Sequence, residues 1–485
     1  MTREPQAFPH LSWAWPQGAL DLLLQAVIGP DEATALAAAR QWFATEDIDA
    51  AGFAEHRLLM AVAARFGHAL ADLPAYPRLA GLQRMLWTKA RMALREVQPP
   101  LALIAGAGIP VMVIKGAARL AVNPADQKSR ISHDTDILVP PAHFAAALEI
   151  LTAHRWQAST GESGLCLAAR LARTRSVNLF YGHFGDIDLH QWGYGAAAPQ
   201  AEADLWRSSV RGRYFDVPVL VPAPEHRIAL ALYSSALDAH AHSDWLVDCA
   251  RVLMQEAVDP GRLHAVLGQG DLAVQAGVAL SYLGDRIGLP VPGLAEVKAQ
   301  ARRAGRLHRL GVVLQMKPRS GWTPLSRLAR GVAKQLRKTF GKGDRPFAAA
   351  GPLDLRGHLR GLRSGWQEQA LTPALSPLAL GPVPRGRHRV DLTLAVDLPG
   401  TRRRLEFELN QNTTHVARLR ARSLLRRKGW HSLRFSGQIT TGEDGQLWLE
   451  ARPSKALRGA DQAETDRYGP LQMRLLSATI RPLTP

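Results

Sequence analysis

Apolar residues recur at steps of three and four through the first hundred residues, which is the spacing of one buried face of an α-helix. Clear examples are Leu20, Leu23, Leu24 and Val27. The segment 84–104 predicts one long helix that breaks at Pro99-Pro100, because proline lacks the N–H that an interior helix position donates. We therefore predict a helical region over residues 1–104.

The pattern changes between residues 105 and 220, where short β-branched and apolar runs alternate with helical spacing. The predicted strands cover 109–114, 136–139, 177–180 and 186–190, and the predicted helices cover 117–122 and 142–154. Strands that alternate with helices predict a sheet with helices packed on it. We therefore predict one mixed-sheet region over 105–220.

Residues 221–340 return to helical spacing, most clearly over 225–254. The last predicted helix, 324–340, carries an apolar stripe formed by Leu325, Leu328, Val332, Leu336 and Phe340. Arg and Lys residues occupy the rest of its surface. Such a basic amphipathic helix either docks on the protein's own body, the commoner outcome, or lies on an anionic membrane surface.

Residues 341–388 are rich in Gly, Pro and Arg and predict a linker. Over 389–485 apolar and polar residues alternate, which is the two-residue period of a β-strand. The predicted strands cover 390–396, 405–409, 433–435, 447–450 and 475–480. Short strands separated by Gly, Pro and Asp turns predict a C-terminal all-β sandwich. The fold class predicted for the whole chain is therefore α+β: a mixed sheet with flanking helices and helical extensions, followed by a β-sandwich.

The chain has 485 residues, of which 46% are apolar, and two cysteines, Cys166 and Cys249. This length predicts two to four domains, and so few cysteines exclude a disulfide framework and a multi-cysteine zinc site. The N-terminus lacks the apolar segment of a signal peptide. The longest apolar run, 99–114, is too short and too broken by glycine and proline to span a bilayer. We expect a cytoplasmic protein, with 324–340 as a peripheral contact to the inner membrane.

The net charge of +18 is unevenly distributed. Residues 302–345 contain thirteen Lys or Arg and one acidic residue, Asp344. A surplus of this kind attracts an anionic partner, which includes nucleic acid, acidic lipid, a phosphorylated substrate and an acidic protein. The charge does not choose among these partners, and a solvated basic helix face is the alternative interpretation.

Carboxylates lie at the ends of the predicted strands. Asp134 and Asp136 are two residues apart, and alternate residues of a strand point to the same face. Carboxylates this close repel each other unless a cation lies between them, and Mg²⁺ prefers such oxygen ligands. A third carboxylate comes from a later strand as either Asp186 or Asp188. The arrangement predicts a site for one or two Mg²⁺ ions that serves nucleotidyl transfer, in which the metal polarises the α-phosphate and an aspartate activates the attacking hydroxyl.

Residues before and after these carboxylates extend the predicted site. Gly116 lets the backbone approach a triphosphate, and Lys115, Lys128 and Arg130 are candidate phosphate contacts. His190 has two interpretations. It either orients Asp188 and touches the substrate, or it is a half-buried histidine at a strand end.

The same residues resemble the motifs of the nucleotidyltransferase superfamily, which are a glycine turn after a strand, an acidic pair one residue apart and a later single carboxylate. More closely, they resemble the bacterial nucleotidyltransferase-like family, whose members are largely uncharacterised. The matching residues are Lys115-Gly116, Arg130, Asp134 with Asp136, and Asp188-Leu189-His190. Further matches over residues 15–310 are a histidine, His226 or His240, and the element Trp245-Leu246-Val247-Asp248.

This resemblance implies the transferase fold, an NTP as donor, and Asp134, Asp136 and Asp188 as the catalytic and metal-binding residues. One position departs from the superfamily, because Ala117 stands where a phosphate-binding Ser commonly follows the glycine. The leading hypothesis is a Mg²⁺-dependent nucleotidyltransferase that transfers an NMP to a hydroxyl or phosphate of an unknown acceptor. Candidate acceptors are a glycan precursor, a small molecule, a protein and a nucleic acid. The alternative is an inactive binding or scaffold protein of the same fold.

A second, weaker resemblance involves the end of the chain. Asp466-Arg467 precedes the last predicted strand and is similar to an element of β-sandwich modules found with polysaccharide-assembly proteins. This similarity implies a link to surface polysaccharide biosynthesis. The other interpretation is an Asp-Arg pair that fixes a turn.

Overall fold

The computed structural model describes residues 8–131, 134–158, 167, 171, 174–195, 198–233, 237–317, 331, 354–361, 378–399, 404–412, 414–422, 428–452 and 473–483. The chain divides into two compact units, one of residues 1–150 and 181–345 and one of residues 151–180 and 346–485. Apart from Gly331, the predicted helix 324–340 lies outside the described residues, and so does the pair Asp466-Arg467.

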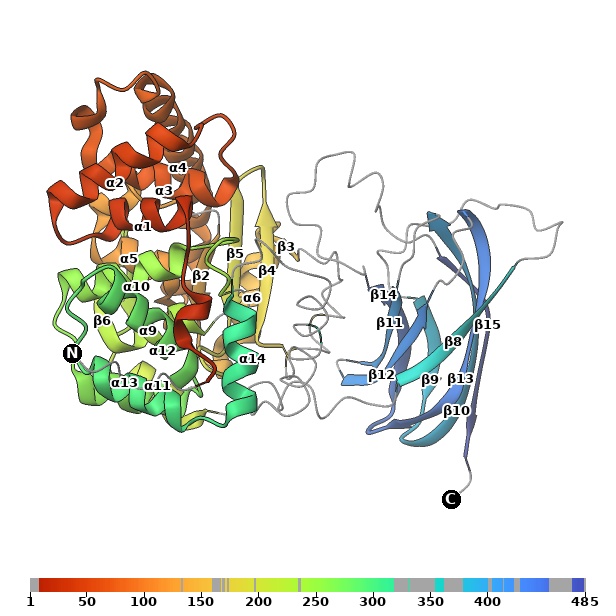
Figure 1. The fold of residues 1–485 in the computed structure, drawn as a ribbon. Helices are drawn as coiled ribbons and strands as arrows, with labels where there is room; N and C mark the ends of the chain where they lie inside the picture. Colours follow the sequence, from red (N-terminus) through yellow and green to blue (C-terminus); the bar gives the residue numbers. More distant parts are fainter. Residues whose placement is uncertain are drawn as a thin grey trace. The chain divides into compact units, whose positions relative to one another are not determined.

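The N-terminal part is helical, as its apolar spacing predicts. Its helices are η1 (Leu11–Ala14), α1 (Ala19–Ile28), α2 (Glu32–Thr45), α3 (Phe53–Phe66), η2 (Gly67–Leu70) and α4 (Tyr76–Gly106) (Figure 1). Helix α4 continues through Pro99 and Pro100, so the predicted break is wrong. Val97 and Leu101 are buried on either side of the two prolines. We attribute the continuity to this packing, which offsets the helical hydrogen bonds that proline removes.

A seven-stranded mixed sheet follows, in the order β3-β4-β5-β2-β1-β7-β6. Its strands are β1 (Met112–Val113), β2 (Thr135–Leu138), β3 (Gln157–Ala158), β4 (Ser176–Tyr181), β5 (Gly185–His190), β6 (Val210–Tyr214) and β7 (Val217–Val221). Strand β2 pairs parallel to β5 and antiparallel to β1. Strand β1 is shorter than the predicted 109–114, although Ile109, Val111 and Ile114 are buried beside it. Val111 and Ile114 still bond to the neighbouring strands, because the Leu220 N–H donates to the Val111 carbonyl at 2.8 Å and the Ile114 N–H donates to the Asp136 carbonyl at 3.1 Å.

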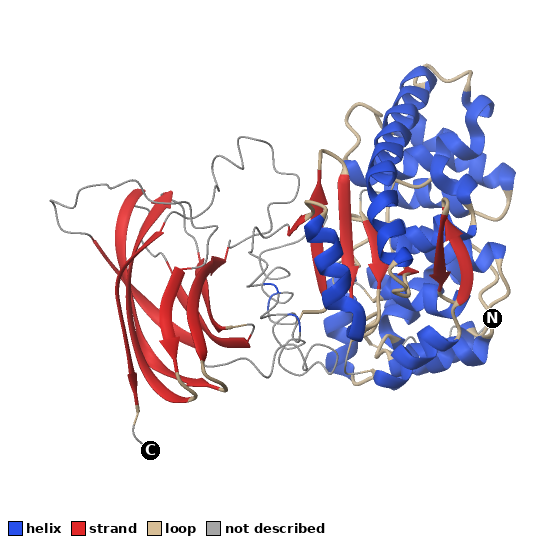
Figure 2. Cartoon of the chain, turned by 180° about the vertical axis from the view of Figure 1, so that it is seen from behind, coloured by secondary structure: helices blue, strands red, loops and turns tan. Residues whose placement is uncertain are grey.

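Helices surround this sheet and continue after it (Figure 2). They are α5 (Lys115–Val122), η3 (Pro124–Lys128), α6 (Pro141–Ala153), α8 (Pro199–Arg207), α9 (Pro224–Leu232), α10 (Asp244–Gln255), α11 (Pro260–Gln269), α12 (Ala273–Ser281), η5 (Tyr282–Arg286), α13 (Leu294–Arg303) and α14 (Arg306–Met316). Within the predicted helical segment 225–254, α9 and α10 are two separate helices. Between them the Asp238 carboxylate accepts the amide N–H of His240 at 3.2 Å. Such a side-chain bond to the local backbone competes with helix formation.

The C-terminal residues form strands, as their two-residue period predicts. The bounds are β8 (Asp354–Gly361), β9 (Leu378–Val383), β10 (Gly386–Pro399), β11 (Arg404–Gln411), β12 (Thr414–Arg422), β13 (Lys428–Thr441), β14 (Gly445–Arg452) and β15 (Met473–Pro482). The strand order is β15-β10-β13-β8-β12-β11-β14-β9. The described pairings are antiparallel except that of β8 with β12. A core that includes Phe407, Leu409 and Phe435 packs between these strands.

Two of these strands, β8 and β9, lie inside the predicted linker 341–388, so that prediction is wrong for their residues. Gly381 and Pro382 gave β9 its linker-like composition. Strand β9 is at the end of the sheet order, where a proline does not remove a required hydrogen bond. The α+β fold class is confirmed. Among the described residues, none of the helices has both the length and the apolar character needed to cross a bilayer.

Candidate functional site

Two aspartates lie side by side in the central sheet. Asp136 is in β2 and Asp188 is in β5, and the parallel register pairs these two residues directly. Ile137 and Ile187 beside them are fully buried. A slip of one residue would expose such apolar side chains, so the core fixes the register. Strand pairing therefore sets the separation of these two carboxylates.

A histidine lies between the two carboxylates. His190 Nε2 is 3.1 Å from Asp136 Oδ1 and 3.0 Å from Asp188 Oδ2. Burial lowers the pKa of His190, but the charge of Asp188 and the hydrogen bonds to both aspartates outweigh burial and raise that pKa above its ordinary value. The raised pKa favours the cationic form of this ring beside the two carboxylates.

The same three residues have the donor set of a divalent-cation site. One ligand atom from each of Asp136, Asp188 and His190 lies within 4.8 Å of the others. Two carboxylates suit Mg²⁺, and an added imidazole also suits Mn²⁺ and Zn²⁺. A cation held there would replace the protonated ring as the neutralising charge. The residues present therefore fit a divalent metal.

Lys115 reaches this cluster from the first residue of α5. Its Nζ donates to Asp136 Oδ1 at 2.5 Å. Lys115 has φ +53°, a left-handed conformation that costs a non-glycine residue energy unless its surroundings fix it. Burial lowers the pKa of Lys115, but the charges of Asp136 and Asp188 outweigh this and raise it. The Lys115 side chain is 31% exposed.

Asp134 lies just before β2 and is half-buried. Its pKa is raised, first because burial disfavours the charged carboxylate and then because Asp136 is negative. The metal-type cluster found among the described residues does not include Asp134. Of the two alternatives for the later carboxylate, the structure brings Asp188 rather than Asp186 into the cluster.

Gly116 is the second residue of α5, and the guanidinium of Arg130 lies against its Cα. A Cβ at this position would be 2.6 Å from Arg130 Nη2 and 3.0 Å from Arg130 Cζ. The absence of a side chain at Gly116 therefore makes room for the arginine. The predicted role of Gly116 in approaching a triphosphate stays a prediction.

Arg130 is fixed by two aspartates of α10. Its Nε and Nη2 donate to the two oxygens of Asp248, both at 3.2 Å, and its Nη1 donates to Asp244 Oδ2 at 2.7 Å. The side chain is 10% exposed. The predicted phosphate contact of Arg130 is untested, and in this structure its donors point at carboxylates. Lys128, the other predicted phosphate contact, is exposed in η3.

Further arginines join Arg130 in one buried ion network. Arg119 donates to Asp126 Oδ2 at 2.5 Å and to Asp248 Oδ1 at 3.2 Å, and Arg57 donates to Asp244. Three arginines thus face three aspartates, so the buried charges balance. Sequence reasoning missed Arg57, Arg119, Asp126 and Asp244. The motif Trp245–Asp248 was the one sequence signal for this network, since it marked the helix α10, which supplies Asp244 and Asp248.

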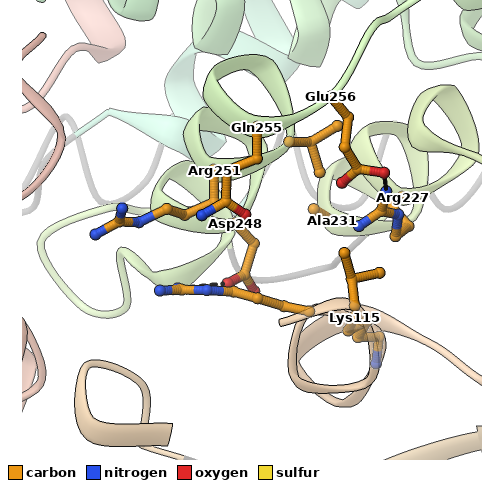
Figure 3. A pocket seen from close by; sticks show the side chains of 10 residues that line it. Lys115, Arg227, Ala231, Asp248, Arg251, Gln255 and Glu256 are labelled. Carbon is orange, nitrogen blue, oxygen red and sulfur yellow. Dashed lines mark hydrogen bonds and ion pairs between the residues drawn. The ribbon is translucent and has the colours of Figure 1, made fainter. Parts of the chain in front are cut away.

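A small cavity lies beside α5 and α10. Figure 3 shows Lys115 on one side of this cavity, with Asp248, Arg251 and Gln255 of α10 opposite and the Arg227–Glu256 ion pair at its edge. The cavity volume is about 10 Å³, which is room for one water molecule. It is too small for a nucleotide.

Other predicted residues have structural partners. Ala117 is 1% exposed, so the position of the superfamily serine is filled by a methyl group packed in the core. His226 is fully buried between Tyr194 Oη, at 2.8 Å, and Asp204 Oδ2, at 3.0 Å. His240 Nε2 accepts the amide N–H of Gln17 at 3.2 Å. These contacts give both histidines a role in packing the fold.

The fold and the site together define the class of protein. Helices cover a mixed sheet, and two adjacent strands of this sheet present paired carboxylates. Residues 52–286 match the model of a family described as uncharacterised nucleotidyltransferases. The matched segment contains every residue of the predicted site. No curated protein and no solved structure matches the chain. The family supports nucleotidyltransferase activity in general, with an NTP as substrate and a divalent metal.

Proposed function

We propose that the protein is a Mg²⁺-dependent nucleotidyltransferase that transfers a nucleoside monophosphate from an NTP to an acceptor hydroxyl or phosphate, with pyrophosphate as the leaving group. The observation that carries this proposal is the cluster of Asp136, Asp188 and His190 inside a nucleotidyltransferase family segment. When bound there, the metal would stabilise negative charge that develops on the α-phosphate. Asp136 and Asp188 would hold the ion, and His190 Nε2 lies within reach of both carboxylates.

Two further residues have roles in this proposal. The Lys115 ammonium bonds to Asp136 and would be available to a substrate phosphate if a bound cation took over the neutralisation of that aspartate. Asp134 accepts the proton of the acceptor hydroxyl. Its raised pKa makes it a better proton acceptor than an ordinary exposed aspartate.

The test is a thermal-shift panel of the four NTPs with and without Mg²⁺, followed by transfer assays with the NTP that binds. Ligand binding to the folded state raises its stability by about 2.7 kcal/mol at roughly a hundredfold excess over Kd. We expect a Mg²⁺-dependent shift in the wild type that is lost in Asp136→Asn and Asp188→Asn. Asp285→Asn is the matched control, because Asp285 pairs with Lys298 on the surface. Transfer that persists in both site variants would contradict the proposal.

A second function is supported by the neutralised state of the site. Lys115 and His190 already supply positive charge to Asp136 and Asp188, and Ala117 offers no hydroxyl to a phosphate. On this alternative the protein binds a nucleotide or another anion through Lys115 without a metal and catalyses no transfer. NTP binding that survives EDTA, without nucleotide consumption, would favour this function over the first.

A further inference from the structure

We infer that Arg130 is a positioning residue, which couples α10 to the first turn of α5 and thereby sets where Lys115 meets Asp136. This inference rests on the proposed function for its catalytic consequence. Arg130 is a residue that the motifs suggested for phosphate binding, and its contacts in the structure support a different role.

The first step is the contact of Arg130 with α5. Its guanidinium lies within 2.6–3.0 Å of the position that a Gly116 side chain would occupy, directly after Lys115. Lys115 is held in a left-handed conformation. The planar guanidinium therefore packs on the backbone at the point where the strained residue begins the helix.

The second step is that the other side of the guanidinium is fixed. Asp248 accepts a forked pair of hydrogen bonds from Arg130, and Asp244 accepts a third. A forked arginine–carboxylate pair defines both distance and orientation, which a lysine does not reproduce. The position of Arg130 is therefore set by α10.

The third step is that α5 is tied to the same carboxylate one turn later. Arg119 donates to Asp248 Oδ1 at 3.2 Å and to Ser129 Oγ at 3.1 Å. Asp248 thus contacts α5 through Arg119 and the Gly116 turn through Arg130. A displacement of α10 would move the start of α5, and with it the Lys115 ammonium that bonds to Asp136.

The experiment compares Arg130→Lys, Asp248→Asn and the double variant in the full-length protein. Hydrogen exchange of the α5 amides is the first measurement, with α12 as the internal reference for folding. We expect faster exchange in α5 for each variant and unchanged exchange in α12. Arg286→Lys is the matched control, because Arg286 donates through two nitrogens to Asp21 elsewhere in the unit. Unchanged α5 exchange in both site variants would overturn the inference, whether or not the protein transfers nucleotides.

The second measurement separates positioning from phosphate binding. A positioning role predicts that kcat falls by about 10²-fold in both single variants, with the affinity for NTP unchanged and no further loss in the double variant. If Arg130 instead bound a phosphate of the NTP, the two single variants would differ in their affinity for NTP. Arg130→Lys would then weaken NTP binding while Asp248→Asn, which releases the arginine, would not, and this result would overturn the inference. Absence of transfer in the wild type would contradict the proposed function and leave the exchange result to decide the positioning role.

Discussion

Gly116→Ala should destabilise the protein, although alanine is a better helix former than glycine. In an exposed helix this change stabilises by about 0.5–1 kcal/mol, because alanine loses less backbone entropy on folding. At Gly116 the new Cβ would be 2.6 Å from Arg130 Nη2. An arginine tip usually moves aside at little cost, but this guanidinium is bonded to Asp244 and Asp248. Forcing a methyl group into a packed site costs about 1–3 kcal/mol. We expect a net loss of roughly 1–2 kcal/mol, since the two effects oppose each other.

The matched control is Gly81→Ala in α4. Gly81 is exposed in the middle of that helix, and a Cβ there has no neighbour within 4 Å. Thermal unfolding of both variants checks the prediction, because about 1 kcal/mol shifts the midpoint by roughly 2–4 °C in a domain of this order of size. We expect a higher midpoint for Gly81→Ala and a lower one for Gly116→Ala. Equal stabilisation by both substitutions would refute the reasoning, because it would show that Arg130 moves freely despite its two aspartates.

Three further predictions concern buried charge, pH and the C-terminal core. Asp244→Ala should destabilise by about 3–5 kcal/mol in denaturant titrations, because it leaves Arg57 without its buried partner carboxylate and removes one of the two carboxylates that pair with Arg130; a loss below 1 kcal/mol would contradict this. Hydrogen bonds from Arg207, His226 and Arg262 lower the pKa of Asp204 to about 2. The stabilisation from these hydrogen bonds to the Asp204 carboxylate is fully present above the unfolded pKa of about 4 and is lost as the pH falls toward 2. Asp204→Asn should therefore flatten the stability–pH curve between these two values. Phe407→Ala should destabilise the sheet formed by the C-terminal strands β8 to β15 by about 3–5 kcal/mol, because Phe407 is fully buried and its ring centroid is 5.5 Å from that of Phe435. Faster hydrogen exchange in β11 and β13 would check this loss, and unchanged exchange would contradict it.

Short-range patterns determined much of the fold. The change from a three-to-four-residue period to a two-residue period separated the helical and sheet regions from the C-terminal strands. Regular spacing reports which side chains face a core, so it identifies elements before their partners are known. The same patterns failed at Pro99-Pro100 and in strands β8 and β9. We attribute the continuous helix at Pro99-Pro100 to packing, and the edge position of β9 tolerates its proline. Spacing along the chain carries neither kind of information.

For the site, the sequence alone identified Asp136, Asp188 and His190 as candidates and placed Lys115 near them. It left Asp186 and Asp188 as alternatives, because both lie on one face of the same strand. Only the pairing of β2 with β5 put Asp188 directly opposite Asp136. Likewise, only the tertiary structure brought Asp244 and Asp248 against Arg130, more than a hundred positions away in sequence. Contacts between distant residues depend on how complete elements pack together, and no local spacing encodes that arrangement.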